Sequence, residues 1–143
     1  MAVGETLAVD RCVLADEGLD TAAGFVSQSE LGFPAIEGLG EHIPTDRGLL
    51  DMVAEFADRV GLCATVSTCS GTDARARAIA QRTGGLAEDM EAAAVGLVAH
   101  RFGVPFGCLR VISNTAGNRD AQVWDLEGAF SALASLTASV WNS

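Results

Sequence analysis

Three carboxylates and a methionine lie together in EDMEAAAV, residues 88–95, directly before a run of alanines. Glu88, Asp89 and Glu91 are the carboxylates, and Met90 separates the last two. Acidic side chains near the start of a helix interact favourably with its dipole, typically by about 0.3–1 kcal/mol each. Helix-start charge is therefore one interpretation of this cluster, but it gives no reason for the methionine.

A second polar cluster ends an apolar run, in RVISN at residues 110–114. Arg110 lies among residues that favour a strand, and a buried arginine needs a carboxylate partner. We expect that partner to come from residues 88–91. Ser113 and Asn114 follow the apolar run, and a plain turn is the alternative interpretation there, because both residue types favour turns.

Strands and helices alternate in the elements predicted around these clusters. The hydrophobic pattern predicts strands over residues 5–15, 62–69 and 105–113, with a short extended piece near Leu86. Periodicity and capping residues predict helices from Thr45 or Asp46 to Val60, from Asp73 to Thr83, from the EDMEAAAV stretch to Phe102, and over 125–141. Within the glycine-rich residues 16–45, GFPAIEGLGEHIPT (32–45) is expected to form a long surface loop.

This alternation predicts an α/β fold with a mainly parallel central sheet covered by helices, and residues 1–143 suit a single domain. In such sheets the ligand site lies at the carboxyl ends of the strands. Three polar stretches follow predicted strands, namely STCSGT (67–72), AEDME (87–91) and RVISN (110–114). We expect them to converge on one crevice.

The charge balance argues against several kinds of partner. The chain has 9 basic residues, all of them arginine, against 19 acidic ones, which gives a net charge of −10. An acidic chain without a basic run repels nucleic acid and anionic membrane surfaces, so a small ligand or another protein is the better expectation. The sequence shows neither a signal-peptide pattern nor an apolar run long enough to span a membrane, which predicts a cytoplasmic protein.

The cysteines and histidines do not follow a metal-binding pattern. Cysteines at 12, 63, 69 and 108 include no pair with CxxC spacing, and the two histidines, at 42 and 100, are isolated. We therefore expect no metal site and interpret the four cysteines as small buried hydrophobic residues.

The stretch EDMEAAAVGLVAHRFGVPFGCLRVISNTAGNRDAQVWDL resembles the C-terminal signature of the nucleoside phosphorylase/nucleosidase family. TVSTCSGTDARARAIAQR and CVLADEGLDTAAGFVSQSELGF share the likeness, which is strongest to the futalosine hydrolase branch. The resemblance implies a three-layer αβα sandwich around a mixed sheet, a purine nucleoside as ligand, and no cofactor. It also implies cleavage of the N-glycosidic bond, which in this branch releases hypoxanthine from futalosine on a route to menaquinone.

By this resemblance, Glu91 binds the 2′- and 3′-hydroxyls of the ribose and Met90 packs against the sugar. Relatives that act on adenine nucleosides carry Asp where this chain has Asn114. The amide of Asn114 can donate to O6 of hypoxanthine while its carbonyl accepts from a proton-bearing N7. Asn114 therefore favours a 6-oxopurine over adenine.

Other positions follow from the resemblance with less support from their chemistry. Gly71 and Thr72 match a loop that lines the purine, while Arg110 and Ser113 are expected to support the site from behind. Trp124 matches an aromatic residue that covers the substrate, and a core aromatic is the alternative interpretation.

The resemblance begins roughly a third of the way into the family pattern. The family's first strands and its water-activating carboxylate have no counterpart before Met1, so the chain resembles an N-terminally truncated member. Three alternatives for the function stay open, namely a futalosine hydrolase, a catalytically impaired fragment of one, and another purine nucleosidase or phosphorylase. The family also suggests a homo-oligomer, a dimer or larger.

Overall fold

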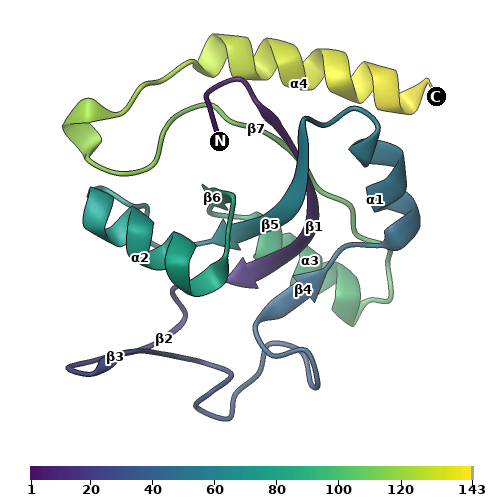
Figure 1. The fold of residues 1–143 in the computed structure, drawn as a ribbon. Helices are drawn as coiled ribbons and strands as arrows, with labels where there is room; N and C mark the ends of the chain where they lie inside the picture. Colours follow the sequence, from purple (N-terminus) through teal and green to yellow (C-terminus); the bar gives the residue numbers. More distant parts are fainter. Residues whose placement is uncertain (143) are drawn as a thin grey trace.

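The computed structural model describes residues 1–142, in which strands and helices alternate along the chain (Figure 1). The strands are β1 (Thr6–Leu14), β2 (Gly18–Thr21), β3 (Gly24–Ser27), β4 (His42–Pro44), β5 (Arg59–Thr65), β6 (Ala87–Asp89) and β7 (Leu109–Val111). The α-helices are α1 (Arg47–Ala54), α2 (Asp73–Thr83), α3 (Ala92–Arg101) and α4 (Leu126–Trp141), and a short 3₁₀ turn covers Arg119–Ala121.

The main sheet is mixed, and β1 is its central strand. β5 runs parallel to β1, and β6 runs parallel to β5 on the far side. β4 and β7 both run antiparallel to β1, β4 along residues 11–13 and β7 along residues 6–8. The mixed sheet agrees with the family resemblance. The alternation of elements predicts a mainly parallel sheet, and the structure differs from this in having two antiparallel strands, β4 and β7.

A bulge in β1 sets which of its side chains share a face. The pairing of β1 with β5 shifts between Val9 and Arg11, which leaves Asp10 as an extra residue. The side-chain alternation therefore switches at the bulge, and one core cluster contains four residues of β1, namely Leu7, Val9, Cys12 and Leu14. Thr45 contacts the bulge, since its hydroxyl lies 2.9 Å from the carbonyl oxygens of both Val9 and Asp10.

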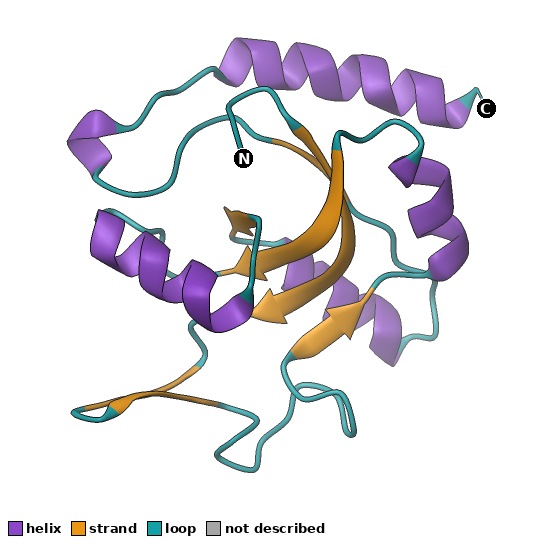
Figure 2. Ribbon diagram, in the orientation of Figure 1, coloured by secondary structure: helices purple, strands orange, loops and turns teal. Residues whose placement is uncertain are grey.

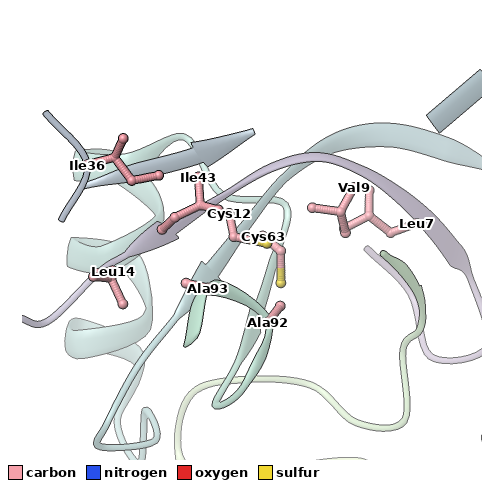
Figure 3. Close-up of a cluster of buried hydrophobic side chains, with 9 residues drawn as sticks. All are labelled: Leu7, Val9, Cys12, Leu14, Ile36, Ile43, Cys63, Ala92 and Ala93. Carbon is pink, nitrogen blue, oxygen red and sulfur yellow. The ribbon is translucent and has the colours of Figure 1, made fainter. Parts of the chain in front are cut away.

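Helices lie on both faces of the sheet, so the fold has three layers (Figure 2), and apolar side chains fill the space between the layers. One cluster joins β1, β4 and β5 to α3 and to Ile36; Figure 3 draws its residues Leu7, Val9, Cys12, Leu14, Ile36, Ile43, Cys63, Ala92 and Ala93. The other joins the sheet to α2 and consists of Val13, Ala15, Leu62, Ala64, Val66 and Ile79. The expected αβα arrangement is confirmed.

Residues 16–45, where the sequence predicts no strand and a surface loop over 32–45, contain three short strands. β2 and β3 form a separate antiparallel hairpin, and β4 joins the main sheet. β2 is exposed along its whole length, so it lacks the apolar alternation from which a strand is recognised. β4 has three residues, of which only Ile43 is buried.

Two predicted boundaries are wrong near short elements. The first helix begins at its predicted cap, where Asp46 accepts from the backbone N–H of Leu49 at 3.0 Å, but it ends at Ala54 rather than at Val60. Val60 belongs to β5, where it pairs with Ala8. The apolar residues keep a helical spacing up to Val60, but the chain leaves the helix earlier because the residues from Arg59 onward pair with β1.

The strand predicted over 105–113 is only three residues long and half-buried. The preceding segment packs closely on α1, since a Cβ at Gly107 would lie 3.0 Å from the Cβ of Leu49. The carbonyl of Cys108 still accepts from Val9 at 2.9 Å.

The last helix forms as predicted, but much of its apolar face is exposed. Asp125 caps α4 by accepting from Gly128 at 2.8 Å. The helix lies across one side of the molecule beside β7 (Figure 1), and Phe130 within it is 68% exposed. None of the helices in residues 1–142 combines the length and apolar character needed to cross a membrane.

Candidate active site

A cleft of about 610 Å³ opens beside β5 and β6. All three polar stretches from the sequence analysis contribute to its wall, including Ser70, Met90, Glu91, Ser113 and Asn114. The expected convergence is confirmed, but its geometry differs. β7 runs antiparallel to β1, so residues 110–114 reach the cleft from the opposite direction and do not share a carboxyl edge with β5 and β6.

Asp89 anchors the first turn of α3. The Thr65 hydroxyl donates to Oδ1 of Asp89 at 2.6 Å and accepts from the backbone N–H of Ala93 at 2.9 Å. The N–H of Ala92 donates to the same carboxylate at 3.2 Å. Asp89 therefore places its negative charge at the start of α3, as one interpretation of the sequence expected. It also fixes the turn that positions Glu91.

Arg110 has the carboxylate partner that its position in an apolar strand requires. Its guanidinium pairs with Asp89, and it lies 3.9 Å from Oε2 of Glu91. Burial is the largest single effect and lowers the pKa of Arg110, but the acidic groups around it, Asp89 first among them, together outweigh burial, and the net shift is upward. A permanent positive charge therefore lies behind Glu91.

Glu91 is the carboxylate of the cluster that remains open to the cleft. Its side chain is 67% exposed, against 11% for Asp89, and its contact with Arg110 is long. An ionised carboxylate can accept hydrogen bonds at both oxygens. Glu91 is thus able to receive two donors from a ligand such as a vicinal diol.

Glu88 has a different role from the two that the sequence suggested. Its carboxylate accepts from the backbone N–H and the hydroxyl of Ser70, both at 2.7 Å. It therefore neither pairs with Arg110 nor stabilises the start of α3. Instead, Glu88 connects the loop that follows β5 to strand β6 through these two hydrogen bonds.

Met90 contacts the loop after β5 through Cys69. The two sulfur atoms are 3.0 Å apart, and both side chains lie at the cleft. Cys69 is exposed, so the expectation of a buried cysteine is wrong at this position. Cys12 and Cys63 are buried as expected, and burial raises the pKa of the Cys63 thiol.

Asn114 and Trp124 lie opposite each other on neighbouring backbone segments. They form an isolated antiparallel bridge, and the N–H of Asp125 donates to the carbonyl of Ser113 at 2.8 Å. The Ser113 hydroxyl donates to Oδ1 of Asn114 at 2.9 Å. Ser113 thereby orients the amide, and Trp124 is brought to the cleft wall, where it is 45% exposed and not a core residue.

Gly71 and Thr72 are not among the residues that line the cleft. Thr72 caps α2, where its hydroxyl accepts from the N–H of Arg75 at 3.2 Å. The carbonyl of Gly71 accepts from the N–H of Arg119 at 3.1 Å. Both residues hold the loop that borders the cleft.

Sequence reasoning missed several residues that shape the site. Thr65 ends β5, and its hydroxyl at the end of a buried strand was the available signal. Arg119 and Gln122 lie in what was expected to be a polar loop, and both line the cleft. No motif marks them, since their positions depend on how the loop folds back onto Ser70.

The αβα fold with a cleft beside β5 and β6 is one shared by a known class of proteins, as comparison with known families shows. The chain belongs to the phosphorylase superfamily, whose family model matches residues 2–140. It is 37% identical over 132 residues to a futalosine hydrolase of Streptomyces coelicolor, covering 92% of this chain and 54% of that protein. A futalosine hydrolase of Thermus thermophilus is 37% identical over 139 residues, covering 93% and 59%.

Solved structures share the fold at lower identity. The 5′-methylthioadenosine/S-adenosylhomocysteine nucleosidase of Helicobacter pylori, with butyl-thio-DADMe-Immucillin-A, matches with a TM-score of 0.79 and 22% identity, covering 99% of this chain and 62% of that one. The native futalosine hydrolase of Helicobacter pylori matches with a TM-score of 0.76 and 22% identity, covering 99% and 61%. The chain spans about half the length of the curated relatives it matches.

Proposed function

We propose that this chain provides the nucleoside site of a futalosine hydrolase, which releases hypoxanthine by hydrolysing an N-glycosidic bond. The observation that carries the proposal is the meeting of Met90, Glu91 and Asn114 in one cleft. The identity of 34–37% to three futalosine hydrolases supports the choice of substrate. The product would feed a route to menaquinone.

In this proposal Glu91 binds the ribose diol and stabilises the reacting sugar. Cleavage of the bond to the base gives the sugar oxocarbenium character, so positive charge develops near the diol. A carboxylate beside that charge lowers the barrier, because the attraction grows as the bond breaks. Arg110, paired with Asp89, lies 3.9 Å from one oxygen of Glu91 and leaves the other oxygen free for the ligand.

Asn114 would recognise the leaving base. One N–H of its amide donates to the Thr115 carbonyl at 3.1 Å, which leaves the second N–H for a base oxygen such as O6. An amide does not act as a general acid at neutral pH, so Asn114 would assist by hydrogen bonding while water supplies the proton.

A second candidate is a nucleoside-binding chain that does not turn its ligand over. The observation that favours it is coverage, since the chain spans only 54% of the Streptomyces coelicolor relative. Activation of the attacking water needs a base within hydrogen-bond reach of the sugar, and none of the groups described above has this role. Binding without hydrolysis would support this candidate.

Incubation with futalosine, with hypoxanthine followed by chromatography, separates the two candidates. We expect hypoxanthine release at a rate that does not change with added phosphate, because hydrolysis uses water as the nucleophile. Dependence on phosphate would favour a phosphorylase instead. Calorimetric binding of futalosine without release would favour the binding chain, and absence of both would contradict the proposal.

We also propose that the protein acts in the cytoplasm as a homo-oligomer. An apolar stripe along α3 supports self-association, since Val95, Val98 and Phe102 follow helical spacing and are 57%, 56% and 79% exposed. Analytical ultracentrifugation of the unaltered chain and of Phe102→Ser tests this, because the variant loses apolar surface from the stripe and should associate less. The unaltered chain should sediment as a dimer or larger, and a monomer at all concentrations would contradict it.

A further inference from the structure

Two arginines line the cleft, and only one of them is paired with a carboxylate. Arg110 is held by Asp89, whereas Arg119 forms no ion pair with any residue in 1–142. The guanidinium of Arg119 donates to Oε1 of Gln122 at 3.0 Å and lies 4.9 Å from the ring centroid of Trp124. Both of these partners are neutral, so its positive charge remains available at the cleft wall.

The position of Arg119 is fixed by the loop that carries it. Its backbone N–H donates to the Gly71 carbonyl at 3.1 Å. The amide of Gln122 donates to the carbonyls of Ser70 at 3.3 Å and Gly117 at 3.1 Å. The group that orients the guanidinium is therefore itself anchored, and an anion that binds there pays less to order a long side chain.

The chemistry of this corner suits a carboxylate. A guanidinium presents paired N–H donors that match the two oxygens of a carboxylate, and charge-assisted bonds of this kind are stronger than neutral ones. Two of the three carboxylates that line the cleft are already engaged, since Glu88 is bonded to Ser70 and Asp89 to Arg110. The third, Glu91, forms no ion pair with Arg119 in residues 1–142. The face of Trp124 offers an apolar surface beside the charge.

We propose that Arg119, oriented by Gln122 and Trp124, is a specificity-determining residue that selects nucleosides carrying a carboxylate on the 5′ substituent. The inference rests on the nucleoside function proposed for the same cleft. A 6-oxopurine and a ribose diol are both neutral near pH 7, and Asn114 and Glu91 suit those two groups. The 5′ carbon is then the remaining place where a nucleoside can carry the anion that Arg119 would bind.

Three ligands of matched shape test this inference by isothermal titration calorimetry, namely inosine, inosine 5′-carboxylic acid and its 5′-carboxamide. The acid and the amide differ mainly in charge. The unaltered chain should bind the acid roughly tenfold more tightly than the amide, the size typical of a charge-assisted hydrogen bond. That preference should weaken as ionic strength rises.

Variants assign the preference to one side chain. Arg119→Gln should bring the acid and the amide within about twofold of each other, so that the ratio of their two dissociation constants falls toward one. Arg119→Lys keeps the charge but not the paired donors, so it should retain part of the preference. Arg101→Gln, an exposed residue of α3 away from the cleft, removes the same charge and should retain all of it.

The outcomes separate this inference from the function on which it rests. Equal affinity for acid and amide in the unaltered chain, or a preference that survives Arg119→Gln, would overturn the role of Arg119 while inosine binding upheld the nucleoside site. Failure of all three ligands to bind would overturn both. Loss of preference in Arg101→Gln as well would show a general charge effect and would likewise overturn the inference.

Discussion

Glu88, Asp89 and Glu91 lie within four residues of each other, yet each carboxylate contacts a different part of the molecule. Glu88 holds Ser70, Asp89 holds Arg110, and Glu91 faces the cleft. The sequence could predict a cluster of charge here, but not this division, because the directions of neighbouring side chains depend on where β6 ends and α3 begins.

Replacing Glu91 by Gln should lower kcat/KM for futalosine by about 100- to 1000-fold, because the negative charge beside the oxocarbenium-like sugar is lost. Hypoxanthine release measured by chromatography gives the ratio. Glu37→Gln, in an exposed loop, is the matched control and should leave the rate unchanged. A similar rate for Glu91→Gln and the unaltered chain would refute the ribose role.

Replacing Asn114 by Asp should shift base preference from hypoxanthine toward adenine nucleosides, because a protonated carboxyl can match the N6 donor and N7 acceptor of adenine. Calorimetry with inosine and adenosine measures the ratio of their dissociation constants, which should change by about tenfold or more. Asn118→Asp places a similar charge in the nearby exposed loop and should not change it. An unchanged ratio in Asn114→Asp would count against base recognition there.

Among the elements, the junction of β5, β6 and α3 does most to place the site. The ends of β5 and β6 are joined by the bond from Thr65 to Asp89, and α3 starts on the same two side chains. The helix was predicted because its alanines favour helix. The way in which α3 is anchored could not be predicted, because it depends on the hydroxyl of Thr65, which is more than twenty residues away in the sequence.

Thr65→Val removes the hydroxyl that joins these elements and leaves the N–H of Ala93 without its acceptor. The free energy of unfolding should fall by about 1–3 kcal/mol, the usual cost of an unsatisfied buried group. Urea denaturation measures it. Thr137→Val is the control, since Thr137 bonds only to its own exposed helix, and a loss equal to that control would contradict the anchoring role.

The starts of β1 and β5 are joined through Asp58, which should make stability depend on pH. Asp58 accepts from the Thr6 hydroxyl at 2.7 Å and its N–H at 2.9 Å, and these bonds lower the pKa of Asp58. Because the folded pKa is below the unfolded value of about 4, the stabilisation is present above pH 4 and is lost as pH falls through the folded pKa.

Asp58→Asn should therefore flatten the acid limb of the stability profile. Urea midpoints measured from pH 5 down to pH 2 should fall less steeply in this variant than in the unaltered chain. Asp51→Asn, which removes an exposed carboxylate paired only within α1, should keep the original slope. An identical slope in Asp58→Asn would contradict the pKa argument.

The sequence predicted long elements better than short ones. α2 runs to Thr83 as predicted and ends at Gly84, which adopts a positive φ of 73°. β4 and β7 have three residues each, and they exist because β1 offers unpaired backbone groups to both. Such pairing is decided by the tertiary structure and leaves little pattern in the short segment itself.

At the scale of the whole molecule, the chain leaves much apolar surface uncovered. The exposed residues of α4 include Leu126, Phe130 and Trp141, the last of them 87% exposed. The sequence predicted the apolar face of this helix but not its exposure, because periodicity shows which face is apolar and not what covers it. Relatives are longer than this chain, which leaves room for further contacts in them.

This surface should bind the dye ANS in the folded state. Phe130→Ser should reduce the fluorescence of bound ANS without a loss of stability, since a side chain that is largely exposed contributes little to the core. Ala8→Ser is a buried contrast that should instead lower the unfolding midpoint. ANS fluorescence unaffected by Phe130→Ser would show that this face is covered in solution.

A competition assay tests the central claim most directly, namely that the cleft is a site for 6-oxopurine nucleosides. Futalosine and 5′-methylthioadenosine are supplied together at equal concentration, and the two free bases are separated by chromatography. Our account predicts that hypoxanthine appears well before adenine. Adenine in excess would contradict the assignment of Asn114, and release of neither base would contradict a catalytic site in this chain.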